Sequence, residues 1–202
     1  ELPMSMLNNL RKPLKPLRVL SIDGGGIRGL YTAILLATLE SRFAEQRGVS
    51  GLDIGKGFDL IVGTSTGAIL AIGLLLGVPT HKIVHLYREL GPKIFQDPVP
   101  AYYNNGYLSS LWRWVWRNWK KSANDITPLR EGMRQYLGEM TLGEAYARRG
   151  IGLCVPAVNM ATHKGITFKT PHSPLRQRDA GYRLLDICMA SVSAPIIFPL
   201  MP

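Results

Sequence analysis

Ser65 is the residue whose type and setting point most directly to chemistry, because it stands between two glycines in the pattern Gly63-Thr-Ser-Thr-Gly67. A short apolar run precedes this pattern and a longer one, residues 68–78, follows it, which predicts a strand, a sharp turn and a buried helix. In so tight a turn, a Cβ at Gly63 or Gly67 would meet neighbouring backbone. The helix would direct its N-terminal amides and dipole at a group bound beside Ser65, which favours a negative oxygen. The pattern therefore predicts a serine nucleophile at an elbow, although turns of small residues also occur for packing alone.

A second glycine-rich loop lies upstream, between a predicted strand at residues 17–22 and a helical pattern over residues 30–47. Consecutive glycines leave their backbone N–H groups unshielded, so such a loop can surround an anion. The predicted oxyanion-binding residues are Gly24, Gly25 and Gly26. A strand, a crossover helix and a second strand at residues 58–62 should place the strands in parallel, so both loops are expected at one edge of the sheet. A serine beside an anion-binding loop provides the two groups that acyl transfer needs, a nucleophile and an oxyanion hole.

The glycine loop also fits the dinucleotide-binding fingerprint, because Gly24, Gly26 and Gly29 have its spacing. That fold needs an acidic residue at the end of a second strand about 20 residues further on. Here the helical pattern continues to Arg47 and a glycine-rich turn follows. We therefore interpret the loop as an anion site and expect no cofactor.

No metal is expected either. His81 and His85 are four residues apart, but no acidic or histidine partner accompanies them in a metal-binding pattern. Ordinary surface or core histidines are the interpretation.

Together the two glycine motifs resemble those of the patatin-like phospholipases, which are lipid acyl hydrolases with a serine–aspartate dyad. The resemblance rests on Asp-Gly-Gly-Gly-Ile-Arg-Gly at residues 23–29 and Gly-Thr-Ser-Thr-Gly at residues 63–67. It continues through residues 155–159 and 166–168, and through residues 186–199 with their Ala-Pro-Ile-Ile-Phe-Pro turn. It implies an α/β fold in which helices flank a parallel-rich central sheet in three layers, α/β/α.

The resemblance also implies roles for individual residues. Ser65 would attack the ester carbonyl of a phospholipid, a lysophospholipid or another acyl lipid, and the glycine loop would hold the oxyanion. Arg28 would either order that loop or meet a phosphate group. The expected product is a free fatty acid, and the expected reaction class is carboxylic ester hydrolysis.

The family's catalytic aspartate belongs to an Asp-Gly-Gly or Asp-Gly-Ala motif that follows the Phe-Pro turn, and residues 1–202 contain no such motif in that place. We expect the sequence to be a piece of a longer protein whose base lies beyond residue 202, so that this piece alone is inactive. One alternative is a Ser–Asp–His arrangement through His163 or His172, with Asp97 or Asp125 as the acid. Another is a lipid-binding or regulatory module of the same fold that lacks the base.

The composition is that of a globular protein with a basic surface. Of the 202 residues 46% are apolar and 19% are charged, which excludes a disordered chain, and the net charge is +10. Residues 1–16 read as an arm or linker and residues 17–202 as one catalytic domain. Nucleic-acid-binding signatures are lacking, so an anionic membrane surface is the expected partner. The longest apolar run, residues 68–78, is too short to span a bilayer, and no signal peptide precedes it, so we expect a cytoplasmic, peripherally membrane-associated protein.

All four tryptophans lie between residues 111 and 121, where a helical wheel separates an aromatic face from a basic one. Aromatic groups at acyl depth and cations at the headgroups are typical of an interfacial helix. The predicted membrane contacts are Trp112, Trp116, Trp119, Arg113 and Arg117. The alternative is that the tryptophan face packs on the core, and a lid over an acyl pocket would satisfy both interpretations.

Overall fold

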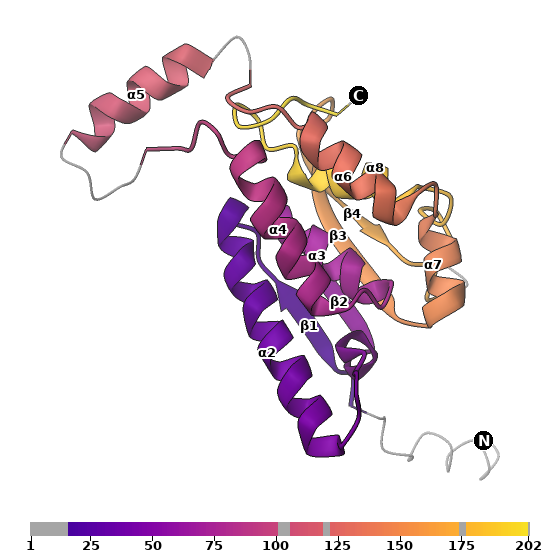
Figure 1. Ribbon diagram of the computed structural model, residues 1–202. Helices are drawn as coiled ribbons and strands as arrows, with labels where there is room; N and C mark the ends of the chain where they lie inside the picture. The colour runs from indigo at the N-terminus through magenta and orange to yellow at the C-terminus, as the bar shows by residue number, and fades with distance from the viewer. Residues whose placement is uncertain (1–15, 101–105, 119–121, 174–176, 202) are drawn as a thin grey trace.

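The computed structural model describes residues 16–100, 106–118, 122–173 and 177–201 (Figure 1). The predicted arm, residues 1–16, lies outside the described residues except for Pro16. The strands are β1 (Val19–Ile22), β2 (Leu60–Gly63), β3 (Gly152–Asn159) and β4 (Lys164–Lys169). The α-helices are α2 (Gly29–Arg47), α3 (Thr66–Leu75), α4 (Thr80–Ile94), α5 (Tyr107–Asn118), α6 (Thr127–Leu137), α7 (Leu142–Arg149) and α8 (Leu184–Val192). Two 3₁₀ turns, η1 (Gly26–Arg28) and η2 (Ile54–Gly57), lie in the connections.

The strands form a single sheet in the order β1-β2-β3-β4. β1, β2 and β3 run parallel, and β4 returns antiparallel to β3. In the pairing of β1 with β2, Ile22 lies opposite Gly63, so the two strands end side by side. The predicted α/β class, with a parallel-rich sheet and flanking helices, is confirmed.

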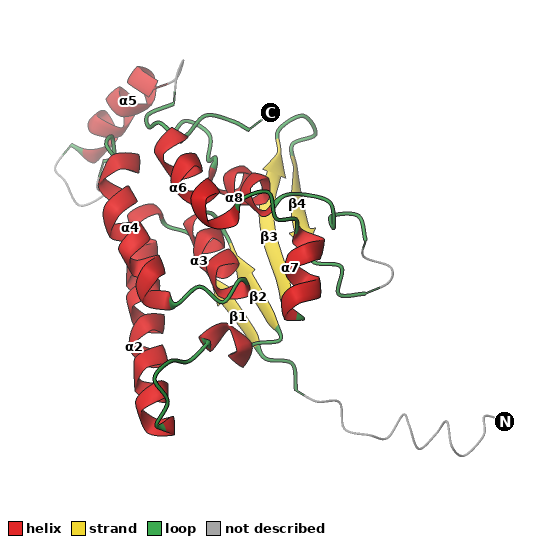
Figure 2. Ribbon diagram, turned by 45° about the vertical axis from the view of Figure 1, so that its right-hand side comes forward, coloured by secondary structure: helices red, strands yellow, loops and turns green. Residues whose placement is uncertain are grey.

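α3 is the central helix of the fold, and all ten of its residues are buried. It packs on the three parallel strands and on α8, while α4 packs against α2, α3 and α6. Successive right-handed crossovers that move in one direction across a sheet keep their helices on one face. Figure 2 shows α3, α4 and α6 on the same side of the strands.

The opposite face of the sheet is more exposed. Along β1 and β2 the residues that face α3, such as Ile22 and Ile61, are buried, whereas their neighbours Val19 and Val62 are not. At the end of β3, Val158 is 63% exposed. The described residues therefore form the sheet and the helices of one face, and the third layer of the predicted α/β/α arrangement is not made by them.

α2 buries only part of the apolar residues in its sequence. Ile34 and Phe43 are exposed, whereas Ala33, Leu36 and Ala44 are buried. The reason is that α2 is apolar on more than one side, and its close packing against α4 selects the side with small residues. At Gly29, a Cβ would lie only 2.9 Å from the ring of Tyr87 on α4.

Two of the later helices begin at residue types that favour helix starts. α6 begins at Thr127-Pro128, where a proline is tolerated. α7 begins with a capping box, in which the Thr141 hydroxyl accepts from the Glu144 N–H and the Glu144 carboxylate accepts from the Thr141 N–H.

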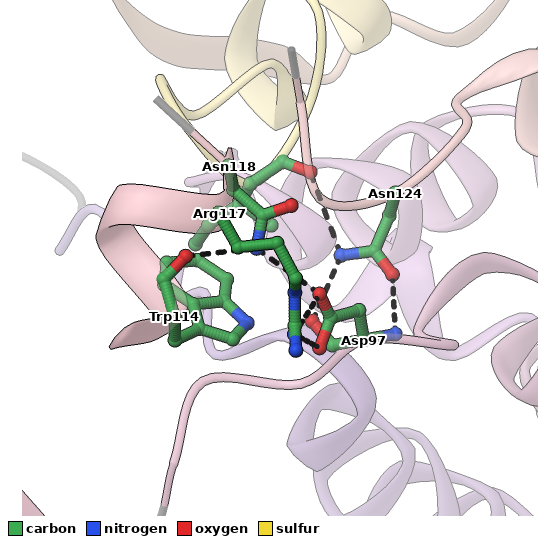
Figure 3. Close-up of polar contacts among 6 residues, drawn as sticks. Asp97, Trp114, Arg117, Asn118 and Asn124 are labelled. Atoms are coloured by element: carbon green, nitrogen blue, oxygen red, sulfur yellow. Dashed lines mark hydrogen bonds and ion pairs between the residues drawn. The ribbon is translucent and has the colours of Figure 1, made fainter. Parts of the chain in front are cut away.

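α5 stands apart from the other helices, at the end of the protein toward which β1, β2 and β3 point (Figures 1 and 2). A polar cluster around Asp97 attaches its last turn (Figure 3). The Asp97 carboxylate accepts hydrogen bonds from Arg117 at 2.6 and 2.7 Å and from the Asn118 amide at 3.0 Å. On the other side, the Asn124 side chain accepts from the Asp97 N–H at 2.9 Å and donates to its carbonyl. The buried ring of Trp114 packs beside this cluster.

The charge state of Asp97 decides whether this attachment holds. Partial burial works to raise the pKa of Asp97, but the hydrogen bonds from Arg117 and Asn118, the charge of Arg117 and the nearby Trp114 outweigh it, so the pKa lies below its ordinary value. A carboxyl group with a lowered pKa stabilises the fold fully above about pH 4, and this contribution is lost as the pH falls through the folded pKa.

We expect Asp97→Asn to loosen α5 at neutral pH, because the amide cannot form the ion pair with Arg117. Amide hydrogen exchange over residues 107–118 should become faster than in the wild type, and the wild type should approach the same rate only well below pH 4. Glu89→Gln, which removes an exposed carboxylate on α4, is the matched control and should leave this exchange unchanged. Equal exchange in Asp97→Asn and the wild type would contradict the assignment.

Candidate active site

Ser65 occupies a strained turn between β2 and α3. Its backbone has φ 54° and ψ −126°, and it serves as the N-cap of α3. Such a conformation costs a non-glycine residue about 1–3 kcal/mol and persists only where surrounding contacts enforce it. A Cβ at Gly63 would lie 2.4 Å from the Gly67 carbonyl oxygen, and a Cβ at Gly67 would lie 2.5 Å from the Ile22 carbonyl oxygen. Both positions therefore require glycine for space, as the sequence predicts for an elbow.

The glycine loop after β1 lies directly against this elbow. A Cβ at Gly24 would come within 2.8 Å of both the Ser65 Cβ and the Thr64 carbonyl oxygen. Gly25 and Gly26 have φ angles of 149° and 62°, which side chains rarely allow. The two loops predicted to converge at the carboxyl edge of the sheet are thus in contact.

The backbone N–H groups around Ser65 differ in whether they already donate a hydrogen bond within the protein. The N–H of Ser65 itself donates to the Ser191 hydroxyl at 2.9 Å, and the N–H of Gly67 donates to the Thr64 carbonyl at 2.8 Å. A second group of N–H groups has no hydrogen-bond partner among the described residues, namely those of Gly24, Gly25, Gly26 and Thr66. An anion at Ser65 would find its donors in this second group, which comes from the glycine loop and the first turn of α3.

Arg28 is folded back onto the glycine loop. Its Nε and its backbone N–H both donate to the Gly25 carbonyl at 3.3 Å. Of the two roles predicted for Arg28, this geometry supports ordering of the loop. The guanidinium is exposed and keeps its remaining donors for a further contact.

A cavity of about 640 Å³ opens beside Ser65. Its walls come from β3, β4 and the stretch that follows α8, and most of the side chains are apolar. They include Pro156, Val158, Ile166, Phe168, Leu200 and Met201. The volume and the lining suit a fatty-acyl chain, which needs an apolar space with few polar groups.

The cavity wall contains no carboxylate or imidazole among the described residues. Asp186 is at the start of α8, where its carboxylate accepts from Arg183 at 2.7 Å. His172 lies beside Thr170, which bonds to Leu153 near the start of β3, at the edge of the sheet opposite to Ser65. His163 is exposed in the turn between β3 and β4. The Ser–Asp–His alternative is therefore not assembled by these residues.

The acids of that alternative have other partners. Asp97 belongs to the cluster that holds α5, and Asp125 accepts from the backbone N–H and the hydroxyl of Thr127 at the start of α6. His81 and His85 lie exposed on α4, without a third potential ligand among the described residues.

α5 presents an exposed apolar stripe. Leu108, Trp112 and Trp116, spaced four residues apart, are 72%, 70% and 82% exposed, whereas Trp114 on the other side is 6% exposed. The alternative that Trp112 and Trp116 pack on the core is thus wrong. None of the helices in the described segments has both the length and the apolar composition needed to cross a bilayer.

The other predicted membrane contacts of this helix have different surroundings. Arg113 is exposed, Arg117 is engaged by Asp97, and Trp119 lies outside the described residues. Sequence reasoning missed Leu108 and the separate role of Trp114, because a helical wheel groups residues by side but does not reveal which side meets the protein.

Sequence reasoning also missed Ser191. The only signal was its position among small residues at the end of a helix, in Ala190-Ser-Val-Ser-Ala194, ahead of Pro195. That stretch contributed to the family resemblance and did not indicate a hydrogen bond to the elbow.

Comparison with known proteins gives a consistent result. A family model described as Patatin-like phospholipase matches residues 20–202. The cGAMP-activated phospholipase of Pseudomonas aeruginosa (strain BWHPSA011 / Pa011) is 37% identical over 182 residues, which cover 90% of this chain and 48% of the relative. The enzyme of the same name from Vibrio cholerae is 35% identical, with 90% and 49% covered. Patatin-T5 of Solanum tuberosum is 28% identical, with 90% and 43% covered.

Among solved structures, VipD from Legionella pneumophila matches with a TM-score of 0.48 and 14% identity, over 91% of this chain and 44% of VipD. The chain spans about half the length of the curated relatives that it matches. Because the family model covers nearly all of the described residues, the chain belongs to the patatin-like phospholipase family.

Proposed function

We propose that residues 17–202 carry the nucleophile and the oxyanion site of a serine lipid acyl hydrolase of phospholipase A or lysophospholipase type. The observation that supports this most directly is the contact between the strained Ser65 elbow and the glycine loop, beside an apolar cavity of about 640 Å³. The names of the relatives, cGAMP-activated phospholipase and patatin, agree with this class of reaction. Because the chain covers about half of each relative, the activity of a whole protein that contains it is part of the proposal.

The reaction proceeds in two steps. The Ser65 Oγ attacks the ester carbonyl carbon while a base takes its proton, and the negative oxygen accepts hydrogen bonds from the N–H groups of Gly25, Gly26 and Thr66. Collapse expels the lysolipid or glycerol alcohol, which takes up the proton and leaves an acyl-serine. Water, deprotonated by the same base, then attacks the acyl carbon. The base returns this proton to the Ser65 Oγ as the fatty acid leaves, which regenerates free Ser65.

We place the base outside the described cavity wall, as an aspartate beyond residue 202. The support is that no carboxylate or imidazole lines the cavity among the described residues, and that the resemblance implies a Ser–Asp dyad. Arg28 keeps the glycine loop in shape, and the exposed part of its guanidinium is available to a lipid phosphate. Neither a metal nor a cofactor takes part in this scheme.

The same proposal includes a peripheral contact with an anionic, cytoplasm-facing membrane through α5. Leu108, Trp112 and Trp116 would enter the acyl region while Arg113 meets the headgroups, and the net charge of +10 favours an anionic surface. The support is the location of this stripe at the end of the protein where the glycine loop and the elbow leave the sheet (Figure 2). A lipid held at α5 would then be at the same end of the protein as the cavity beside Ser65.

The second candidate function is a lipid-binding or regulatory module without catalysis. The observation in its favour is the absence of a base among the described residues of the cavity wall. The two candidates differ in whether Ser65 is required for fatty-acid release.

Ser65→Ala in the full-length gene product should abolish the release of fatty acid from mixed phospholipid vesicles, because the proposed acyl intermediate forms on the Ser65 Oγ. Loss of a nucleophile lowers turnover by at least about 1,000-fold in enzymes of this kind. Ser41→Ala, an exposed serine of α2, is the control and should retain full activity. Residues 1–202 alone should release almost none. Intact lipid binding with no release by the wild type would favour the non-catalytic module.

The double substitution Trp112→Ala and Trp116→Ala should weaken binding to anionic vesicles at least tenfold. Burial of a large apolar side chain contributes about 1.5–3 kcal/mol, and each tenfold change in binding corresponds to about 1.4 kcal/mol. Tyr136→Ala, an exposed aromatic residue of α6, is the control and should bind as the wild type does. Vesicle flotation measures the effect, and the tryptophan emission of the wild type should shift to the blue. Equal flotation of the double variant and the wild type would contradict a membrane role for α5.

A further inference from the structure

Ser191, near the end of α8, joins three parts of the fold with one hydroxyl group. Its Oγ accepts the N–H of Ser65 at 2.9 Å and donates to the carbonyl of Pro156 on β3 at 2.7 Å. Ser191 lies 126 residues beyond Ser65 in the chain. A hydroxyl has only one hydrogen, and the bond to Pro156 uses it, so an oxygen lone pair is left facing the Ser65 N–H.

This bridge occupies the place where two strands separate. β2 and β3 stop pairing at Val62 and Cys154, because the chain after β2 turns away into the elbow. Ser65 and Pro156 lie just beyond those positions, one on each side of the gap. The Ser191 hydroxyl therefore replaces a direct strand-to-strand hydrogen bond with an N–H···O–H···O=C bridge, in which each bond polarises the other.

The elbow is held differently on its two sides. On the side of β1, the Thr64 N–H donates to the Ile22 carbonyl at 3.1 Å, which is a contact between two backbones. On the side of β3, a side chain holds the elbow backbone: the Ser65 N–H donates to the Ser191 hydroxyl. A residue with a positive φ keeps that conformation only when contacts on every side enforce it. Ser191 supplies the contact on the side of the cavity.

The bridge also decides which amides can reach an oxyanion. Because the Ser65 N–H is occupied by Ser191, it does not compete with the N–H groups of Gly25, Gly26 and Thr66 for a developing negative oxygen. A free Ser65 N–H would let the peptide unit between Thr64 and Ser65 rotate, and the Oγ would move with it. A displacement of 1 Å from the productive position can lower a rate about 100-fold.

We infer that Ser191 is a positioning residue for Ser65: its hydroxyl fixes the elbow peptide through the Ser65 N–H, and so aims the Oγ at the acyl carbonyl. This inference rests on the proposed nucleophilic role of Ser65. Ser191 itself lines the cavity, so a bound acyl chain would shield the bridge from water.

The test measures how fast Ser65 is covalently modified by an alkyl fluorophosphonate in the full-length gene product, with the site mapped by mass spectrometry. Ser191→Ala should slow this reaction about 10- to 100-fold, because the elbow peptide is no longer fixed. Ser41→Ala is the control. Ser41 is exposed on α2 and does not line the cavity, so its loss should change the rate less than about threefold.

Two further variants separate positioning from stability. Ser191→Thr keeps the hydroxyl and should recover most of the rate. Ser191→Cys keeps nearly the same volume but donates and accepts weakly, so it should be slow even when its thermal unfolding matches the wild type. A wild-type rate in Ser191→Cys or Ser191→Ala would overturn the inference, and so would a fully slow Ser191→Thr that is as stable as the wild type.

The outcome for Ser191 can be distinguished from the outcome for the proposed lipid reaction. With a lipid substrate, Ser191→Ala should lower kcat and leave KM nearly unchanged, because the cavity is intact. Modification of Ser65 that depends on Ser191, in a protein that releases no fatty acid, would support Ser191 and contradict the proposed substrate. A wild-type protein whose Ser65 is not modified at all would overturn both.

Discussion

The structure depends on the close approach of backbones around Ser65, which only glycines permit. Gly67 brings the first turn of α3 against the end of β1, and Gly24 brings the loop after β1 against Ser65. Each contact leaves no room for a Cβ, so a side chain at either position would force the neighbouring backbone segments apart. The N–H groups of the glycine loop and Ser65 are thereby brought close together by backbone packing rather than by flexible side chains.

This steric constraint explains which features the sequence predicts well. The elbow at Ser65 and the loop at Gly24–Gly26 are visible because the required residue types stand close together in the chain, and parallel strand order then brings them to one edge. The capping box at Thr141 is visible for the same local reason. Ser191 is not, since nothing near it in sequence shows that its hydroxyl meets an amide 126 residues away.

Which side of a helix or sheet becomes buried depends on its tertiary neighbours. The sequence of α2 offers apolar residues on several sides, and only the approach of α4 selects Ala33 and Leu36 over Ile34. The sequence of α5 likewise does not show which side of the helix faces the protein. A helical wheel of its sequence separates the tryptophans from the cations. In the structure, the ion pair between Arg117 and Asp97 turns Trp114 inward and leaves Trp112 and Trp116 in solvent. One face of the sheet is likewise left exposed, because all crossovers of the described strands lie on the other.

The stretch after α8 connects these separate features. Asn124, which bonds to Asp97 at the base of α5, is also bonded through its N–H to the carbonyl of Ile197, and Phe198 packs edge-on against Phe95 at the end of α4. The same stretch supplies Leu200 and Met201 to the cavity wall beside Ser65. α5 and the cavity wall beside Ser65 are therefore linked through Asp97, Asn124 and the stretch after α8. The elbow is held separately, because the Ser65 N–H donates to the Ser191 hydroxyl, which in turn donates to the Pro156 carbonyl on β3.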